Sequence, residues 1–143
     1  MAAWDEAREL ARLNGAIVEA EGYPKLLGMR FVEAKPDRLV AEMAWRRDLT
    51  MVYGVLHGGA TVGFADTVAG VATWMRLAEG QLFQTIDLQA SYLRGCRGGR
   101  LRATAIPVHL GRRLHVWTVE VRDEEARLVA QCKVTQLVME GGR

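Results

Sequence analysis

Apolar positions in the first twenty residues recur at helical spacing. Ala7, Leu10, Leu13 and Ile17 fall on one face, and charged residues occupy the others. The stop signal Gly22-Tyr23-Pro24 is expected to end this helix. The pattern therefore predicts an N-terminal helical extension over residues 1–24, followed by one domain over residues 25–143.

Alternating apolar and polar positions then predict strands at Gly28–Ala34 and Arg38–Trp45, followed by a loop from Arg46 to Leu56. Ile86, Leu88, Ala90 and Tyr92 alternate with polar residues and are expected to share one strand face. That strand begins a run of four expected to be joined as consecutive hairpins: Thr85–Leu93, Leu101–Leu110, Leu114–Arg122 and Leu128–Leu137. Such a run favours an antiparallel sheet.

Between these groups of strands, Gly58–Met75 holds a single charged residue, Asp66. Its length would suffice for a membrane span. However, an aspartate at mid-span costs about 2.5–3.5 kcal/mol on insertion scales, and the glycines and threonines dilute the hydrophobicity. A helix that is apolar on all sides is better interpreted as a buried helix. A buried helix packed on an antiparallel sheet predicts an α+β domain.

Composition agrees with a single domain. The chain has 143 residues, of which 50% are apolar and 25% are charged, as in an ordinary globular domain. The net charge of +2 excludes a uniformly basic nucleic-acid-binding surface. The charge is uneven, however, because no acidic residue lies between Leu88 and Val119. This basic block contains six arginines: Arg94, Arg97, Arg100, Arg102, Arg112 and Arg113. It could bind an anion or form a solvated basic surface.

The chemistry-bearing residues exclude several site types. Cys96 and Cys132 have no C-x-x-C spacing and are expected to be reduced bystanders. The histidines have no ligand-like spacing with cysteine or glutamate, so neither a metal nor a cofactor is expected. The first residues include acids and lack an apolar run, which argues against a signal peptide. We therefore expect a cytoplasmic protein without membrane or nucleic-acid partners.

Asp66 is the principal candidate for chemistry, because a carboxylate in a buried helix is costly unless it is paired or functional. Burial would suit it to general-base work, and pairing with an arginine or capping of a neighbouring segment is the alternative. Small residues at helical spacing predict a shallow groove beside it: Gly59, Val62, Gly63, Ala69, Gly70 and Thr73. Gly58 and Gly59 offer unobstructed backbone N–H groups where the helix begins, which suits an oxyanion, although a flexible loop is the alternative.

These motifs together resemble the hotdog-fold acyl-CoA thioesterases, in particular the PaaI-like (phenylacetate-degradation) branch. The resemblance covers Leu26 to Leu137 and rests on Gly54-Val55-Leu56-His57-Gly58-Gly59 ahead of Asp66, on Thr85-Ile86-Asp87-Leu88 and on Tyr92-Leu93-Arg94. It implies a hotdog fold, in which a curved antiparallel sheet wraps a long central helix. It also implies a homodimer or a dimer of dimers with active sites shared between subunits.

The resemblance also implies roles for single residues. Gly58 N–H would polarise the thioester carbonyl, Asp66 of the partner would act as general base or nucleophile, and Thr85 would hold the water or the carboxylate. His57 would organise the loop, and Gly59 would lie beside the substrate. The phosphates of coenzyme A are candidate partners for Arg94, Arg97, Arg112 and Arg113, because the arginine fork matches phosphate geometry.

Met51 departs from the family pattern, because the family commonly has an asparagine there and methionine lacks its hydrogen-bond donor. We expect hydrolysis of aromatic or medium-chain acyl-CoA. The departure at Met51 motivates the alternative, a non-catalytic or weakly active acyl-CoA-binding or sensing protein. A hotdog dehydratase is a third possibility, which His57 in its Gly-Gly context fits poorly.

Overall fold

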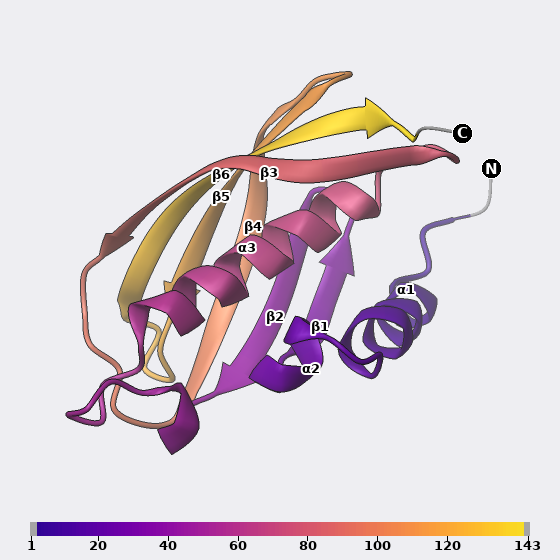
Figure 1. The fold of residues 1–143 in the computed structure, drawn as a ribbon. Helices are drawn as coiled ribbons and strands as arrows, with labels where there is room; N and C mark the ends of the chain where they lie inside the picture. The colour runs from indigo at the N-terminus through magenta and orange to yellow at the C-terminus, as the bar shows by residue number, and fades with distance from the viewer. Residues whose placement is uncertain (1–2, 142–143) are drawn as a thin grey trace.

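A long helix, α3 (Gly58–Trp74), lies against one face of a six-stranded antiparallel sheet (Figure 1). This computed structural model describes residues 3–141. The sheet comprises β1 (Arg30–Lys35), β2 (Arg38–Ala44), β3 (Gln81–Tyr92), β4 (Arg100–Leu110), β5 (Leu114–Arg122) and β6 (Leu128–Glu140). The expected α+β architecture, a sheet wrapped around one central helix, is confirmed.

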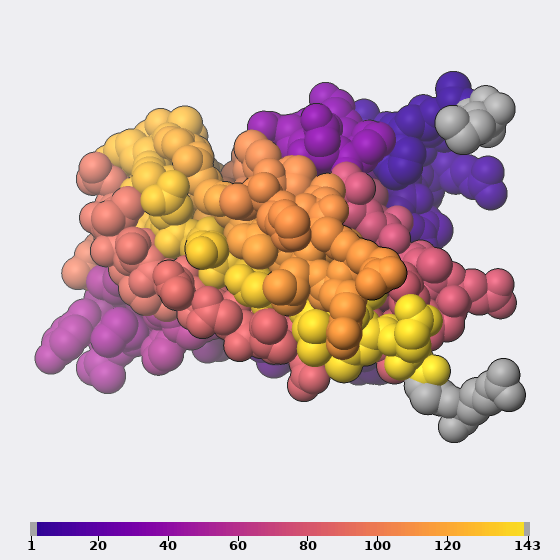
Figure 2. All heavy atoms as spheres, turned by 90° about the horizontal axis from the view of Figure 1, so that it is seen from above, coloured from indigo at the N-terminus to yellow at the C-terminus, as the bar shows by residue number. Residues whose placement is uncertain are grey.

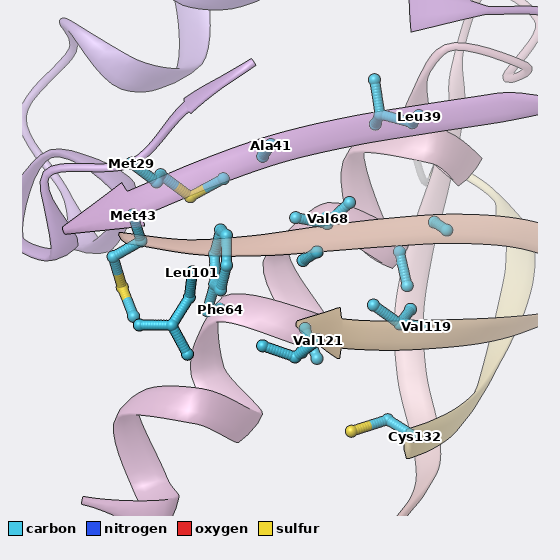
Figure 3. Packing of buried hydrophobic residues seen from close by; sticks show 14 of the residues in the cluster. Met29, Leu39, Ala41, Met43, Phe64, Val68, Leu101, Val119, Val121 and Cys132 are labelled. Carbon is cyan, nitrogen blue, oxygen red and sulfur yellow. The ribbon is translucent and has the colours of Figure 1, made fainter. Parts of the chain in front are cut away.

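The core lies between α3 and the sheet. Phe64 and Val68 on α3 are fully buried, as are Leu101, Val119 and Val121 on the strands that face them (Figure 3). Because α3 packs with most of its circumference inside the protein, its nearly continuous apolar sequence is explained by burial. Within residues 3–141, none of the helices combines the length and the hydropathy that a membrane crossing requires.

The strand order differs from the predicted run of hairpins. The order in the sheet is β1-β2-β4-β5-β6-β3, so β3 pairs with β6 and β4 lies between β2 and β5. The prediction that β3 and β4 form a hairpin is therefore wrong. The connection between them carries the chain across the sheet, where Trp45 N–H donates to Gly99 O at 2.8 Å beside the start of β4. Alternation identifies strands, but it does not identify their pairing partners.

A bulge in β3 changes which side chains face α3. The pairing of β3 with β6 shifts register between Thr85 and Asp87, and Ile86 is left 54% exposed. The prediction that Ile86 shares a face with Leu88 is wrong, because an extra residue reverses the alternation at that point. The bulge instead allows Thr85 to reach α3 from the same strand as Leu88.

The N-terminal segment forms helices, but not one continuous helix. It contains α1 (Glu6–Leu13), the π-helical turn η1 (Asn14–Val18) and a short helix α2 (Tyr23–Leu27). Helix α2 was not predicted, because Gly22-Tyr23-Pro24 was interpreted only as the end of the first helix. In the structure the same residues also begin α2, which has proline in its first turn. A 3₁₀ turn, η2 (Arg47–Leu49), lies in the predicted loop. The domain bounds 1–24 and 25–143 stay a prediction, and residues 1–2 and 142–143 lie outside the described part.

Side chains of the N-terminal segment cover the edge of the sheet at β1. Asn14 Nδ2 donates to Phe31 O at 3.0 Å, and its Oδ1 accepts from Phe31 N at 2.9 Å. Glu6 accepts from Ala34 N at 3.0 Å. The opposite edge, β3, has no neighbouring strand beyond β6 in the described chain, and Figure 2 shows it along one side of the molecule. One edge is thus protected against further pairing and the other is available for it.

A buried polar cluster interrupts the core near the C-terminal end of α3. Thr73 Oγ1 accepts from Trp117 Nε1 at 2.8 Å and lies 3.2 Å from His115 Nδ1. Burial lowers the pKa of His115 below its ordinary value of 6.5, and the positive charge of Arg76 adds to the effect. The folded protein therefore favours a neutral ring at this position.

We expect the free energy of unfolding to fall as pH drops below 6.5. The unfolded chain then binds a proton at His115 before the folded chain does, and the loss ends once pH falls below the lowered pKa of the folded state. Replacing His115 with Gln should reduce this acid sensitivity. Urea unfolding at pH 7.5 and at pH 5.5 measures it, and equal losses in the wild type and the variant would contradict the assignment.

Candidate active site

The first turn of α3 presents a free backbone donor. His57 is the N-cap, and its Nδ1 accepts from Gly59 N at 2.8 Å, which places the ring proton on Nε2. Among the described residues, the N–H of Gly58 has no hydrogen-bond partner. The helix N-terminus adds positive potential at this point. Gly58 N–H is therefore available to a negatively charged or polarised oxygen, whereas the N–H of Gly59 is engaged by His57.

Tyr92 holds the first turn of α3 from the end of β3. Its hydroxyl donates to Gly58 O at 3.0 Å, and partial burial raises the pKa of that hydroxyl above its ordinary value. A Cβ placed on Gly58 would lie 3.1 Å from the Tyr92 ring, so only glycine fits here without displacement. The sequence pattern put Tyr92 on the same strand face as Leu88 and Ala90, but it gave no sign of this contact with Gly58.

A cleft of about 450 Å³ opens beside Gly58. Its walls are largely apolar and include Met51, Leu56, Tyr92 and Leu93. Arg94 contributes a positive charge to the lining. The volume is within the usual range for a small-molecule site, and an apolar cleft with few polar groups is typical of one.

Asp66 lies in the middle of α3 and faces β3. Thr85 Oγ1 donates to Asp66 Oδ1 at 2.8 Å, and both residues are half-buried. Within residues 3–141, Asp66 forms no ion pair with a lysine or an arginine. The Thr85 hydroxyl thus contacts the Asp66 carboxylate, one of the two contacts that the resemblance implies, and no arginine partner of Asp66 is seen in the described chain.

The groove expected beside Asp66 is filled by side chains of the same chain, and this part of the prediction is wrong. The Tyr23 hydroxyl of α2 lies against Gly63, and the Phe83 ring lies 3.2 Å from the position of a Cβ on Gly70. Glycines on α3 thus allow close packing of aromatic side chains. They do not leave an empty channel at these two positions.

A fully buried amide, Gln136 of β6, lies behind Thr85. Its amide group can take two orientations. In the first, Nε2 donates to Thr85 Oγ1 at 3.3 Å, but the amide oxygen faces another acceptor, Ala69 O. The reversed amide donates to Ala69 O at 3.2 Å and accepts from Gly70 N at 3.0 Å, which satisfies both of its ends. We therefore favour the reversed orientation, in which Gln136 ties β6 to α3 beneath the Asp66–Thr85 pair.

One chain does not bring Gly58 and Asp66 together. They are eight residues apart on the same straight helix, which separates them by about 12 Å along its axis at 1.5 Å per residue. A single thioester carbonyl cannot contact both groups at that distance. The two residues that were expected to act on the thioester thus lie at different heights on α3.

The four arginines predicted to bind phosphates are divided between two ends of the sheet. Arg94 lines the cleft beside Gly58, and Arg97 Nη1 donates to Tyr53 O at 2.6 Å in the loop next to it. Arg112 and Arg113 lie in the turn between β4 and β5, where Arg113 O accepts from Val138 N at 2.8 Å. That turn is at the other end of β6 from the cleft, so a single protomer does not gather the four arginines.

Met51 lies in the cleft wall with its side chain 51% exposed, and its backbone N–H donates to Val55 O at 2.8 Å. The neighbouring hydroxyl of Thr50 donates its single proton to Arg47 O at 2.7 Å, so this proton is not available to a water or a substrate. Thr50 is therefore a poor replacement for the amide donor absent at residue 51. In the described part of the chain, no group of three histidine, cysteine, aspartate or glutamate side chains is placed to hold a metal.

Several known proteins are similar to this chain. Residues 53–130 match the model of the thioesterase superfamily. The chain is 31% identical over 137 residues to the proofreading thioesterase EntH of Klebsiella pneumoniae, covering 96% of this chain and 98% of that protein. It is 33% identical over 113 residues to the 1,4-dihydroxy-2-naphthoyl-CoA hydrolase of Escherichia coli, covering 79% and 83% of the two proteins.

Solved structures agree as well. A mutant of the thioesterase PA1618 from Pseudomonas aeruginosa superposes with a TM-score of 0.86 at 28% identity, over 97% of this chain and 99% of that one. The thioesterase HI1161 from Haemophilus influenzae superposes with a TM-score of 0.81 at 28% identity, over 97% and 93% of the two chains. The family match spans the first turn of α3, Asp66 and Thr85. The chain belongs to the thioesterase superfamily, a family of thioester hydrolases with the hotdog fold.

Proposed function

We propose that this protein hydrolyses acyl-CoA thioesters with an aromatic or medium-chain acyl group, in the manner of the PaaI-like branch. The observation that carries this proposal is the pair of half-sites on α3: a free N–H at Gly58 and a carboxylate at Asp66 held by Thr85. One relative is named for an aromatic CoA thioester, which supports the proposed substrate class. The apolar cleft beside Gly58 supports it too.

A symmetric dimer completes the site. Because Gly58 and Asp66 are about 12 Å apart on one helix, each needs its counterpart from a second chain. Side chains from α1 and η1 cover the β1 edge, whereas the twelve-residue β3 edge is open for pairing. Pairing of two β3 edges sets the two α3 helices side by side in opposite directions, with Gly58 of each chain near Asp66 of the other. A dimer of dimers then contains four such sites.

The reaction follows from these groups. The thioester carbonyl oxygen accepts from Gly58 N–H, and the positive end of α3 stabilises the charge that develops on it. Asp66 of the other chain either removes a proton from water as the water attacks the carbonyl carbon, or attacks that carbon itself. In both routes the C–S bond breaks and coenzyme A leaves as its thiolate. In the second route, water then hydrolyses an acyl-aspartyl anhydride. Neither route calls for a metal or a cofactor.

Coenzyme A phosphates are the proposed partners of Arg94 and Arg97, which lie on or beside the Gly58 cleft. A guanidinium fork donates two hydrogen bonds to a phosphate at once. Arg112 and Arg113 lie at the far end of the sheet, so they can join this site only from another subunit. We place the reaction in the cytoplasm, in agreement with the expectation from the sequence.

An acyl-CoA panel tests the proposed activity. Release of free thiol is measured with benzoyl-, phenylacetyl-, octanoyl- and acetyl-CoA. We expect kcat/KM to be highest for an aromatic or medium-chain thioester and lowest for acetyl-CoA. Tight binding without turnover of any of the four would favour the alternative function, a non-catalytic acyl-CoA-binding or sensing protein, which Met51 motivates because it lacks an amide donor.

Thr85 can be tested by shape-conserving substitutions. Thr85→Val keeps the branched side chain but removes the hydroxyl that donates to Asp66 at 2.8 Å. We expect kcat to fall about 10- to 150-fold, since a hydrogen bond to a charged group contributes about 1.5–3 kcal/mol. Thr85→Ser keeps the hydroxyl and should retain most of the activity. A Thr85→Val variant as active as the wild type would remove Thr85 from the site.

A further inference from the structure

A second pocket lies at the opposite end of α3 from Gly58. Its volume is about 270 Å³, and it is bounded by the turn between β1 and β2, the end of α3 and Trp4 of the N-terminal segment. Met75, at the end of α3, lies about 25 Å along the helix axis from Gly58. This pocket is thus separate from the proposed thioester site, and it lies on the β1–β2 side of α3, away from the open β3 edge.

The inner walls of this pocket are apolar and aromatic. Trp4 and Trp117 line it together with Leu39 and Met75. Both indole N–H groups are already satisfied, because Trp4 Nε1 donates to Ala34 O at 2.9 Å and Trp117 Nε1 donates to Thr73 Oγ1 at 2.8 Å. Trp4 is 49% exposed and offers most of the apolar contact surface to a ligand, whereas Trp117 is only 1% exposed and forms the floor of the pocket.

The charged side chains that line the pocket are all positive: Lys35, Arg38 and Arg76. Lys35 and Arg38 share one carboxylate, Glu33, at 3.1 Å each. Arg76 has no acidic partner within residues 3–141. Its guanidinium donates to Pro36 O and lies 5.9 Å from the centre of the Trp117 ring. The pocket thus has an excess of positive charge beside an apolar interior.

We propose that this pocket binds a small amphipathic carboxylate, with its carboxylate on Arg76 and an aromatic or short branched body against Trp4 and Trp117. An arginine fork matches a carboxylate bidentately. The apolar walls favour a ligand with an organic body over inorganic phosphate. An enclosed cavity of about 150 Å³ accommodates benzene, so 270 Å³ suits one substituted ring and is too small for a nucleotide. The site is independent of the proposed thioesterase chemistry.

The four tryptophan indole N–H resonances of the full-length ¹⁵N-labelled protein report on this site. We expect titration with benzoate to shift the Trp4 and Trp117 signals saturably. The Trp45 signal should stay unchanged, because Trp45 lies at the other end of the molecule and donates to Gly54 O. Benzyl alcohol, which has the ring without the charge, should bind at least about tenfold more weakly. Inorganic phosphate should cause no shift.

Three variants separate a specific site from general attraction. Arg76→Gln should raise the dissociation constant for benzoate about tenfold or more, and Trp4→Ala should raise it by removing one wall. Lys133→Gln removes an exposed cation on β6 and should leave binding unchanged. The proposal is overturned if benzoate shifts only Trp45, if phosphate binds as well as benzoate, or if Arg76→Gln binds like the wild type.

Discussion

Replacing Asp66 with Asn is expected to lower kcat for the best acyl-CoA substrate by about 10²- to 10⁴-fold, the usual contribution of a general base. The amide keeps the size of the carboxylate and can still accept from Thr85 Oγ1, so the fold and the dimer should survive. It cannot take a proton from water or attack a carbonyl. Steady-state thiol release at saturating substrate measures the effect.

Asp87 offers a matched control, because it is an exposed carboxylate two residues after Thr85 on β3. Asp87→Asn also replaces one carboxylate with an amide, but on β3 instead of α3, and should keep kcat close to that of the wild type. Equal activity of the wild type and Asp66→Asn would remove Asp66 from the mechanism. If Asp66 is the nucleophile and water attacks the aspartyl carbon of the anhydride, a single turnover in H₂¹⁸O leaves ¹⁸O in the Asp66 carboxylate, a label that a general base does not acquire.

The second large effect is expected at Gly58, where a pair of substitutions isolates one N–H group. Gly58→Pro should lower kcat about 10²- to 10³-fold, the usual loss when one oxyanion donor is removed. Proline suits the first position of a helix, because the N–H there has no helical partner. His57 has φ −65° and ψ 134°, a conformation that also suits the residue before proline.

Gly58→Ala is the matched control. Both substitutions place a Cβ about 3.1 Å from the Tyr92 ring, so any cost of that contact is common to them. Only proline removes the N–H, and we expect alanine to retain most of the activity. Equal losses in the two variants would assign the effect to the shape of the cleft. Full activity of both would show that Gly58 N–H does not bind the carbonyl oxygen.

Local sequence signals predicted the helix that carries Gly58 and Asp66. The apolar run with one carboxylate identified a buried helix, and the Gly-Gly pair after His57 identified its start. Both signals act within a few residues, where helix capping and burial dominate. The family resemblance implied that Thr85 holds either the water or the carboxylate, and in the structure its hydroxyl donates to the carboxylate of Asp66.

Features set by distant parts of the chain were not predicted. The bulge at Ile86 and the pairing of β3 with β6 depend on which strands are neighbours in the sheet. The alternation of apolar and polar residues within a strand does not specify its neighbour. Tyr23 fills the space at Gly63 from a helix forty residues earlier. The arginines of the basic block lie at two ends of the sheet because the long strand β4 separates them, and a count of charges along the sequence does not reveal this.

The central claim, a site built from two chains, is tested most directly by mixing two inactive variants. Asp66→Asn and Gly58→Pro subunits are each expected to be nearly inactive alone. In a hybrid dimer, one site combines intact Gly58 with intact Asp66, and the other carries both defects. Equal amounts of the two subunits, coexpressed so that they mix randomly, should therefore recover about one quarter of wild-type kcat per site, since half of the dimers are hybrids. A mixture no more active than its parents would contradict a site shared between subunits.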